Sequence, residues 1–130
     1  MIIDTALAAC NIDYPINRYR VIICDDDNDT ALAEVLQPML AEYPQLFYQA
    51  REKVEGVPHH YKAGNLQSGI DFAAALEGGA GEYLATLDSD MIPHAEWLRA
   101  LLPHLLRDDK LGLVSPPQVC SPFPRPDLIC

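Results

Sequence analysis

The chain has 130 residues, 49% of them hydrophobic, and nine Lys and Arg against nineteen Asp and Glu give a formal net charge of −10. This length predicts one domain with a packed interior. Such an acidic chain repels a nucleic-acid backbone and anionic membranes, so a phosphorylated ligand would need a metal ion or a local Lys. The sequence has no apolar run of the roughly 18–20 residues that span a bilayer, and no signal-peptide pattern, so we expect a cytosolic chain without a membrane segment.

The first half of the chain predicts a helix, a strand and a second helix. Residues 2–10 are Ala-rich and apolar, as in a short helix, and a turn follows around Pro15. Residues 19–24 form a β-branched apolar run typical of a buried parallel strand, which ends at a cluster of acidic residues. Apolar residues then recur at helical spacing over 32–43, after Asn28 or Asp29 as the N-cap.

The next part of the chain repeats this alternation. Residues 46–50 predict a second short strand, and 51–61 read as a loop without periodicity. A helix is expected over 64–77, ended by two glycines. Residues 82–87 predict a third strand, which again ends at acidic residues.

The last part predicts a helix over 93–107 and a fourth strand over 111–115, before a Pro-rich end. Helices that alternate with strands favour an α/β fold with a mostly parallel sheet flanked by helices. Ligands of such sheets bind beyond the carboxyl ends of the strands, where both acidic clusters fall.

Asp88 and Asp90 are the sharpest candidates for chemistry. Two carboxylates that flank one residue after a buried strand offer hard oxygen ligands to Mg²⁺ or Mn²⁺. A structural alternative is that Asp90 caps the following helix. Asp25 and Asp26 end the first strand and are expected to contact a ligand, whereas Asp27 and Asp29 favour a solvated turn and an N-cap.

Lys62 and Gly64 stand where a loop enters a helix. Backbone N–H groups at a helix N-terminus attract anions, Gly allows close approach, and Lys adds a positive charge for a phosphate. A plain helix start with a solvated Lys is equally compatible with the spacing. We interpret the neighbouring His59 and His60 as loop residues rather than metal ligands, and Trp97 as a core residue.

The four cysteines form no Cys-x-x-Cys pair, and their spacing fits neither a zinc site nor a secreted disulfide framework. We expect reduced, mostly buried thiols.

The clusters, taken in order, resemble the processive family 2 glycosyltransferases of the cellulose synthase and hyaluronan synthase type. The resemblance rests on four blocks: Tyr19-Arg20-Val21-Ile22-Ile23-Cys24-Asp25-Asp26 with the preceding Asp13-Tyr14-Pro15, His60-Tyr61-Lys62-Ala63-Gly64-Asn65-Leu66-Gln67-Ser68-Gly69, Leu87-Asp88-Ser89-Asp90-Met91-Ile92-Pro93 followed by Trp97-Leu98, and Val114-Ser115-Pro116-Pro117-Gln118. It implies a glycosyltransferase A-type fold that transfers a sugar, with inversion, from a nucleotide-sugar (usually a uridine diphosphate sugar) to a glycan acceptor.

By position, the resemblance assigns nucleotide and donor binding to Asp25, Asp26, Lys62 and Asp88, and metal binding to Asp88 and Asp90. It implies Mg²⁺ or Mn²⁺ as the cofactor. Residues 1–118 correspond to the N-terminal, nucleotide-sugar-binding half of the catalytic domain, and 119–130 form a Pro-rich tail. A full-length family member would lie at the cytosolic face of a membrane.

Several family features are missing from the sequence: the segment before the first helix, the Gly after the paired Asp (Asp27 stands there), the acidic motif that supplies the general base, and the Gln-x-x-Arg-Trp motif. The catalytic base is therefore unassigned. One alternative is a truncated, non-catalytic remnant that binds nucleotide or nothing. Another is a Mg²⁺-dependent phosphatase of the haloacid dehalogenase type, which Ile92 disfavours because Thr is expected there.

Overall fold

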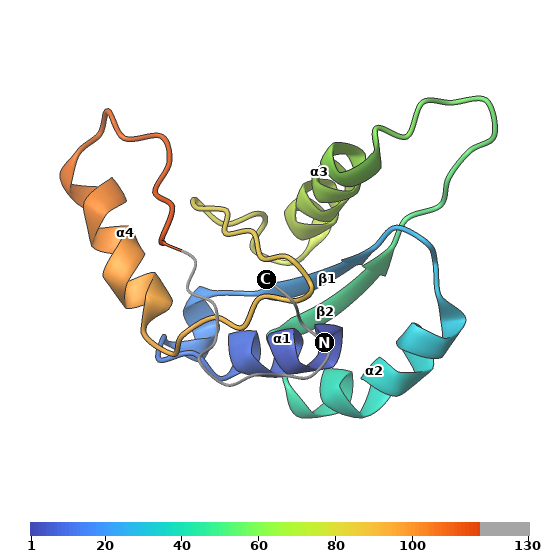
Figure 1. The fold of residues 1–130 in the computed structure, drawn as a ribbon, viewed down its shortest axis with the longest axis horizontal. Helices are drawn as coiled ribbons and strands as arrows, with labels where there is room; N and C mark the ends of the chain where they lie inside the picture. The colour runs from blue at the N-terminus through green and yellow to red at the C-terminus, as the bar shows by residue number, and fades with distance from the viewer. Residues whose placement is uncertain (118–130) are drawn as a thin grey trace.

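Two parallel strands joined through a helix form the centre of the computed structural model, which describes residues 1–117 (Figure 1). In chain order the elements are α1 (Ile2–Cys10), the 3-10 turn η1 (Ile16–Arg18), β1 (Val21–Asp25), α2 (Thr30–Glu42), β2 (Leu46–Ala50), α3 (Tyr61–Ala75) and α4 (Trp97–Arg107). The expected α/β class with a parallel sheet flanked by helices is confirmed, although the described sheet has two strands.

The β1–α2–β2 unit follows the sequence signals closely. The Asp29 side chain caps α2 by accepting hydrogen bonds from the backbone N–H groups of Ala31, at 2.9 Å, and Leu32, at 3.3 Å. Helix α2 runs through Pro38 and ends at Glu42. The register pairs Val21 with Leu46 and continues residue by residue to the carboxyl ends of both strands.

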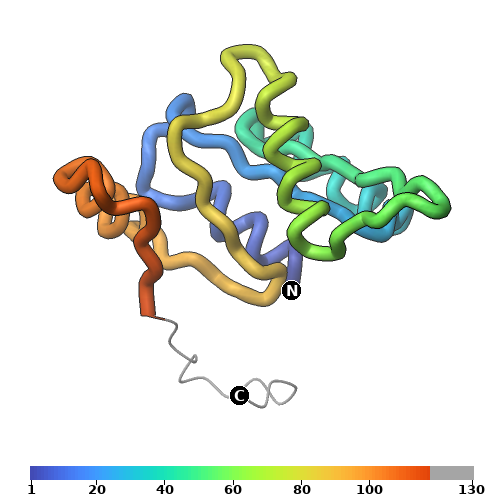
Figure 2. The backbone as a smooth tube through the Cα atoms, turned by 90° about the horizontal axis from the view of Figure 1, so that it is seen from above, coloured from blue at the N-terminus to red at the C-terminus, as the bar shows by residue number. Residues whose placement is uncertain are grey.

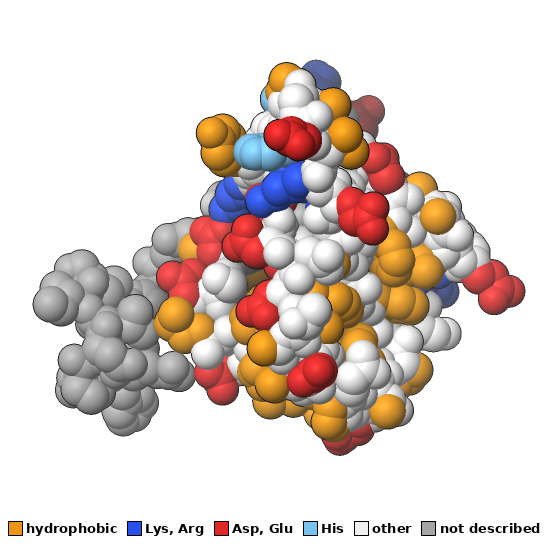
Figure 3. Space-filling view, turned by 90° about the vertical axis from the view of Figure 1, so that its right-hand side faces the viewer, with side chains coloured by type: hydrophobic (Ala, Val, Ile, Leu, Met, Phe, Trp, Pro, Cys, Tyr) orange, Lys and Arg blue, Asp and Glu red, His pale blue; other side chains and the backbone are white. Residues whose placement is uncertain are grey.

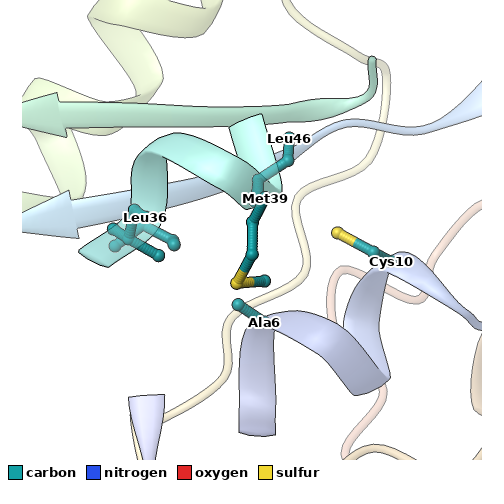
Figure 4. Packing of buried hydrophobic residues seen from close by; sticks show 6 residues of the cluster. Ala6, Cys10, Leu36, Met39 and Leu46 are labelled. Carbon is teal, nitrogen blue, oxygen red and sulfur yellow. The ribbon is translucent and has the colours of Figure 1, made fainter. Parts of the chain in front are cut away.

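The buried core lies between the sheet and the first two helices. Figure 4 shows Met39 of α2 between Leu46 of β2 and Ala6 of α1, with Leu36 and Cys10 on either side. Leu36 is fully buried, at 0% exposure. Cys10 is buried and Cys24 is half-buried, and both are free cysteines in the structure. Cys120 and Cys130 lie outside the described residues.

Helix α3 packs against β1 and β2 through small and aromatic residues. Gly69 is buried against Cys24, and a methyl group in its place would collide with the Cys24 Sγ atom. The rings of Phe47 and Phe72 meet edge to face, with centroids 6.4 Å apart. This packing fixes the start of α3 near the carboxyl ends of the strands.

The predictions of strands at 82–87 and 111–115 are wrong: neither segment forms a strand among the described residues. Leu84 is 66% exposed and Leu113 is 79% exposed, so these apolar runs do not lie within a sheet. The segment after α3 instead runs back alongside that helix toward the N-terminus (Figure 2). There the Thr5 hydroxyl donates a hydrogen bond of 2.9 Å to the Ser89 carbonyl.

Two helix boundaries also differ from those expected. Helix α3 begins at Tyr61 rather than residue 64, and α4 begins at Trp97 rather than residue 93. Trp97 is half-buried, as are four leucines of the same helix, Leu98, Leu101, Leu102 and Leu105. The expected Pro-rich tail, 119–130, lies outside the described residues. Within residues 1–117, every helix is too short or too polar to cross a bilayer.

Candidate functional site

The candidate site begins where the two parallel strands end together. Asp25 is the last residue of β1 and pairs in register with Ala50, the last residue of β2. The Arg51 N–H donates a hydrogen bond of 3.0 Å to the Asp25 carbonyl, so Asp26 and Arg51 emerge side by side. This edge is where α/β sheets bind ligands.

The Asp25 carboxylate is hydrogen-bonded to protein groups around the end of β1. It accepts hydrogen bonds from the Tyr48 hydroxyl, at 2.6 Å, and from the backbone N–H groups of Asp27, at 2.9 Å, and Asp29, at 2.6 Å. Burial tends to raise the pKa of Asp25, but these bonds and one from Asn28 together lower it below its usual value. Asp25 is 8% exposed, so its clearest role is to shape the acidic turn, and its contact with a nucleotide stays a prediction.

Asp26 carries the more accessible carboxylate, and two cations hold it. Oδ1 pairs with Arg51 Nη2, and Oδ2 lies 3.1 Å from Lys53 Nζ. Partial desolvation tends to raise the pKa of Asp26, but hydrogen bonds from Lys53 and Arg51 lower it overall. Asp26 is therefore held ionised in one position.

The first turn of α3 connects this strand end to the second acidic motif. Lys62 Nζ pairs with Asp88 Oδ1, and Asn65 Nδ2 donates a hydrogen bond of 2.9 Å to the Cys24 carbonyl. Residues three apart in a helix share one face. One face of a single turn thus contacts both Asp88 and the end of β1, which supports the expectation that the acidic motifs share a site.

Close packing explains Gly64. A methyl group at this position would overlap the His59 carbonyl oxygen and the Arg51 guanidinium. His60 and Tyr61 adopt positive φ angles of 54° and 45°, which bring the chain sharply into α3. An open hollow of about 420 Å³ borders this turn.

His59 and His60 both lie in this turn. The His59 ring packs edge to face against Tyr61, with centroids 5.0 Å apart. Within residues 1–117 there is no group of three or more His, Cys, Asp or Glu side chains placed to hold a metal ion.

Asp88 and Asp90 nevertheless fit a magnesium or manganese ion that is shared with a diphosphate. Such ions use one or two protein carboxylates and take their other ligands from phosphate oxygens and water. Asp88 is half-buried and Asp90 is exposed, and the two flank Ser89, whose carbonyl accepts the hydrogen bond that anchors this segment to α1. The donor chemistry therefore suits the expected cofactor.

Arg51 is the residue that sequence reasoning missed, because 51–61 was interpreted as a loop without pattern. A signal was present: a cation directly follows one predicted strand, and acidic residues directly follow its neighbour. In Figure 3 a band of Lys and Arg side chains lies between a histidine and a group of acidic side chains.

Comparison with known proteins finds a family model and several curated relatives that match most of the chain. The sequence model described as "Glycosyl transferase family 2" matches residues 2–125. The chain is 29% identical over 107 residues to glucomannan 4-beta-mannosyltransferase 1 of Cyamopsis tetragonoloba, covering 82% of this chain and 20% of that protein. It is 30% identical over 111 residues to glucomannan 4-beta-mannosyltransferase 1 of Oryza sativa subsp. japonica, with the same coverage.

A third relative is the probable glucomannan 4-beta-mannosyltransferase 11 of Oryza sativa subsp. japonica, 27% identical over 107 residues, which cover 82% of this chain and 18% of that protein. The chain thus spans about a fifth of the length of the curated relatives it matches. No solved structure is significantly similar to it.

Proposed function

Because the chain belongs to glycosyl transferase family 2, we propose that it forms the donor-binding part of a sugar transferase, in which a nucleoside diphosphate sugar binds at the carboxyl ends of β1 and β2. Asp26 lies on the nucleotide side of this site, and Lys62, Asp88 and Asp90 lie on the diphosphate side. Mg²⁺ or Mn²⁺ would be held by Asp88 and Asp90.

One observation carries the proposal. The first turn of α3 contacts Asp88 through Lys62 and the end of β1 through Asn65. Three segments that are far apart in the sequence therefore meet at one edge of the sheet. A chain with net negative charge can bind an anionic ligand only where positive charges offset the repulsion locally, and Lys62 supplies one such charge.

The chemistry of transfer suits these residues. Breaking a sugar–phosphate bond leaves negative charge on a nucleoside diphosphate, and a divalent cation, when bound, stabilises that charge. Lys62 is well placed to contribute because its pair with Asp88 is solvent-exposed, and exposed ion pairs are weak. Lys62 can therefore turn from Asp88 to a phosphate oxygen at little cost.

The relatives' names suggest the transferred group and its acceptor. Each is a glucomannan 4-beta-mannosyltransferase or a probable one, so we propose mannosyl transfer to a β-linked glycan. Uracil is the base expected from the broader family resemblance. Inversion at the sugar carbon is part of the same proposal, and the group that would deprotonate the acceptor hydroxyl is not assigned.

Calorimetry on the full 130-residue chain tests donor binding. Uridine diphosphate and guanosine diphosphate are titrated with and without Mn²⁺, and one of them should bind measurably only when Mn²⁺ is present. Asp88→Asn and Asp90→Asn should each abolish the Mn²⁺ dependence. Asp109→Asn removes the same charge beyond α4 and should leave binding unchanged.

Binding of neither nucleotide in the presence of Mn²⁺ would sink the proposed function. So would equal heats with and without the ion, because the two carboxylates would then have no part in binding. A preference for guanosine diphosphate would overturn only the assignment of the base.

A further inference from the structure

We propose that Arg51 is a positioning residue of the donor site, which holds Asp26 and the turn that leads into Lys62 in one fixed arrangement. The proposal rests on the proposed function, since it concerns how the same site is built. It assigns no direct contact between Arg51 and the donor.

The sheet register brings Arg51 to this place. Arg51 directly follows β2 and bonds through its N–H to the Asp25 carbonyl, which places its side chain beside Asp26. The Arg51 side chain is only 12% exposed. A charged side chain so little exposed needs partners, and here the partners are parts of the candidate site.

The guanidinium joins two segments. Its Nη2 pairs with Asp26 Oδ1, and its Nη1 donates a hydrogen bond of 2.5 Å to the His59 carbonyl. One planar cation therefore fixes both the acidic end of β1 and the entry to α3, which carries Lys62 three residues later. A flexible Lys ammonium lacks this two-armed geometry.

Gly64 gives independent support for a crowded, specific contact. Its missing side chain leaves the space in which the His59 carbonyl and Arg51 Nη1 lie, since a methyl group there would strike both atoms. Helix α3 can thus approach the guanidinium closely. The guanidinium therefore lies among the Asp26 carboxylate, the His59 carbonyl and the first turn of α3.

Lys53 provides a contrast at the same carboxylate. It lies 3.1 Å from Asp26 Oδ2 and 3.3 Å from Asp27 Oδ1, but it makes no described contact with the turn before α3. If charge alone positioned Asp26, Lys53 and Arg51 would be equivalent. If Arg51 acts by joining the two segments, its loss should be more damaging.

The test measures the affinity of the full chain for uridine diphosphate with Mn²⁺, or for guanosine diphosphate if that is the nucleotide that binds. Arg51→Gln should weaken binding roughly ten- to a hundredfold, the range expected for loss of a charge-assisted hydrogen bond. Arg51→Lys, which keeps the charge, should restore little of the loss. Lys53→Gln should change affinity by less than Arg51→Gln.

A matched control comes from Arg20, at the opposite end of β1. Arg20 Nη1 donates a hydrogen bond of 2.6 Å to the Gly79 carbonyl, and its Nη2 bonds the Glu77 carbonyl. Arg20→Gln therefore removes another loop-anchoring guanidinium, but far along the strand from the candidate site. It should leave nucleotide affinity unchanged, and thermal melts of all variants report whether the fold is kept.

A double-mutant cycle separates positioning from general structural damage. If Arg51 acts through Asp26, Arg51→Gln should cost much less affinity in an Asp26→Asn background than in the wild-type chain. Wild-type binding that is unchanged by Arg51→Gln, or losses that are fully additive, would overturn the role of Arg51 alone. Failure of the wild-type chain to bind either nucleotide would overturn the proposed function, and this role with it.

Discussion

Replacement of Gly64 by Ala tests whether the entry to α3 is as tightly built as the structure indicates. Two effects oppose each other. Ala is favoured over Gly within a helix by about 1 kcal/mol. The added methyl group would meet the His59 carbonyl and Arg51, and overpacking of this kind costs about 1–3 kcal/mol.

The steric effect should prevail because neither neighbour moves freely. The His59 carbonyl belongs to the backbone, and Arg51 is held by Asp26 and by that same carbonyl. Gly64 also lies at the start of the helix, where the gain from Ala is smallest. We therefore expect Gly64→Ala to lower the free energy of unfolding by about 1–2 kcal/mol, which is roughly 3–10 °C in melting temperature for a chain of this size.

Gly69 in the same helix provides the comparison. A methyl group there would meet mainly the Cys24 Sγ atom, a single side-chain atom that can rotate away. The position lies inside α3, where Ala gains its full helix preference. Gly69→Ala should therefore cost less than Gly64→Ala, and the difference should shrink or reverse if Cys24 is first replaced by Ala.

The assay is urea unfolding followed by circular dichroism, with nucleotide affinity measured on the same samples. Gly64→Ala should lose both stability and affinity, because displacement of Arg51 disturbs Asp26. A Gly64→Ala chain as stable as the wild type would refute the reasoning about the turn. Loss of stability with full retention of affinity would refute the link from this turn to the site.

Three further changes test other parts of the structure. Leu36→Ala should lower the free energy of unfolding by about 2–5 kcal/mol, because this fully buried side chain fills the core between α2 and the sheet, and a smaller loss in urea unfolding would place it outside the core. Lys62→Gln should weaken nucleoside diphosphate binding about tenfold but leave binding of the bare nucleoside unchanged, and equal losses for both would contradict its role at the diphosphate. Burial, with help from Asp25, raises the pKa of Tyr48 to about 12, so the free energy of unfolding should fall between about pH 10 and 12, and should fall less in Tyr48→Phe. The lowered pKa of Asp25 predicts a second fall below about pH 4, which Asp25→Asn should flatten. Unfolding curves across pH that do not differ between the wild type and these variants would contradict both predictions.

The first half of the fold could be predicted from local patterns. Helices α1 and α2 and strands β1 and β2 lie close to where hydrophobic periodicity and the Asp29 cap indicated. These segments pack against one another, so their own patterns carry most of the information. Predictions from periodicity are strongest where neighbours in sequence are also neighbours in space.

The two wrong strands show where such reasoning ends. Residues 82–87 and 111–115 have apolar runs like those of β1 and β2, but a strand exists only where another strand pairs with its backbone. A local pattern does not contain that information. The positive φ angles of His60 and Tyr61 were not predicted either, because neither position holds Gly, the residue that adopts such angles readily.

The roles of the candidate site residues stay predictions, whereas the way in which the fold builds the site is new information from the structure. Asp26, Lys62 and Asp88 were chosen from motifs, and the contacts through α3 explain how they come together. The buried role of Asp25 and the linking role of Arg51 depend on side-chain geometry at the strand ends. Only the register of β1 on β2 reveals that Arg51 stands beside Asp26.

The central claim is that separate segments form one metal-dependent nucleotide site. Paramagnetic broadening of backbone amide signals by substoichiometric Mn²⁺, with and without the nucleoside diphosphate, tests it most directly. We expect signals of residues 88–90, 62–65 and 25–26 to broaden together, strongly only when the nucleotide is present, and to recover in an Asp88→Asn, Asp90→Asn double variant. Broadening confined to other acidic positions such as residues 108–109, or unaffected by the double variant, would contradict the account.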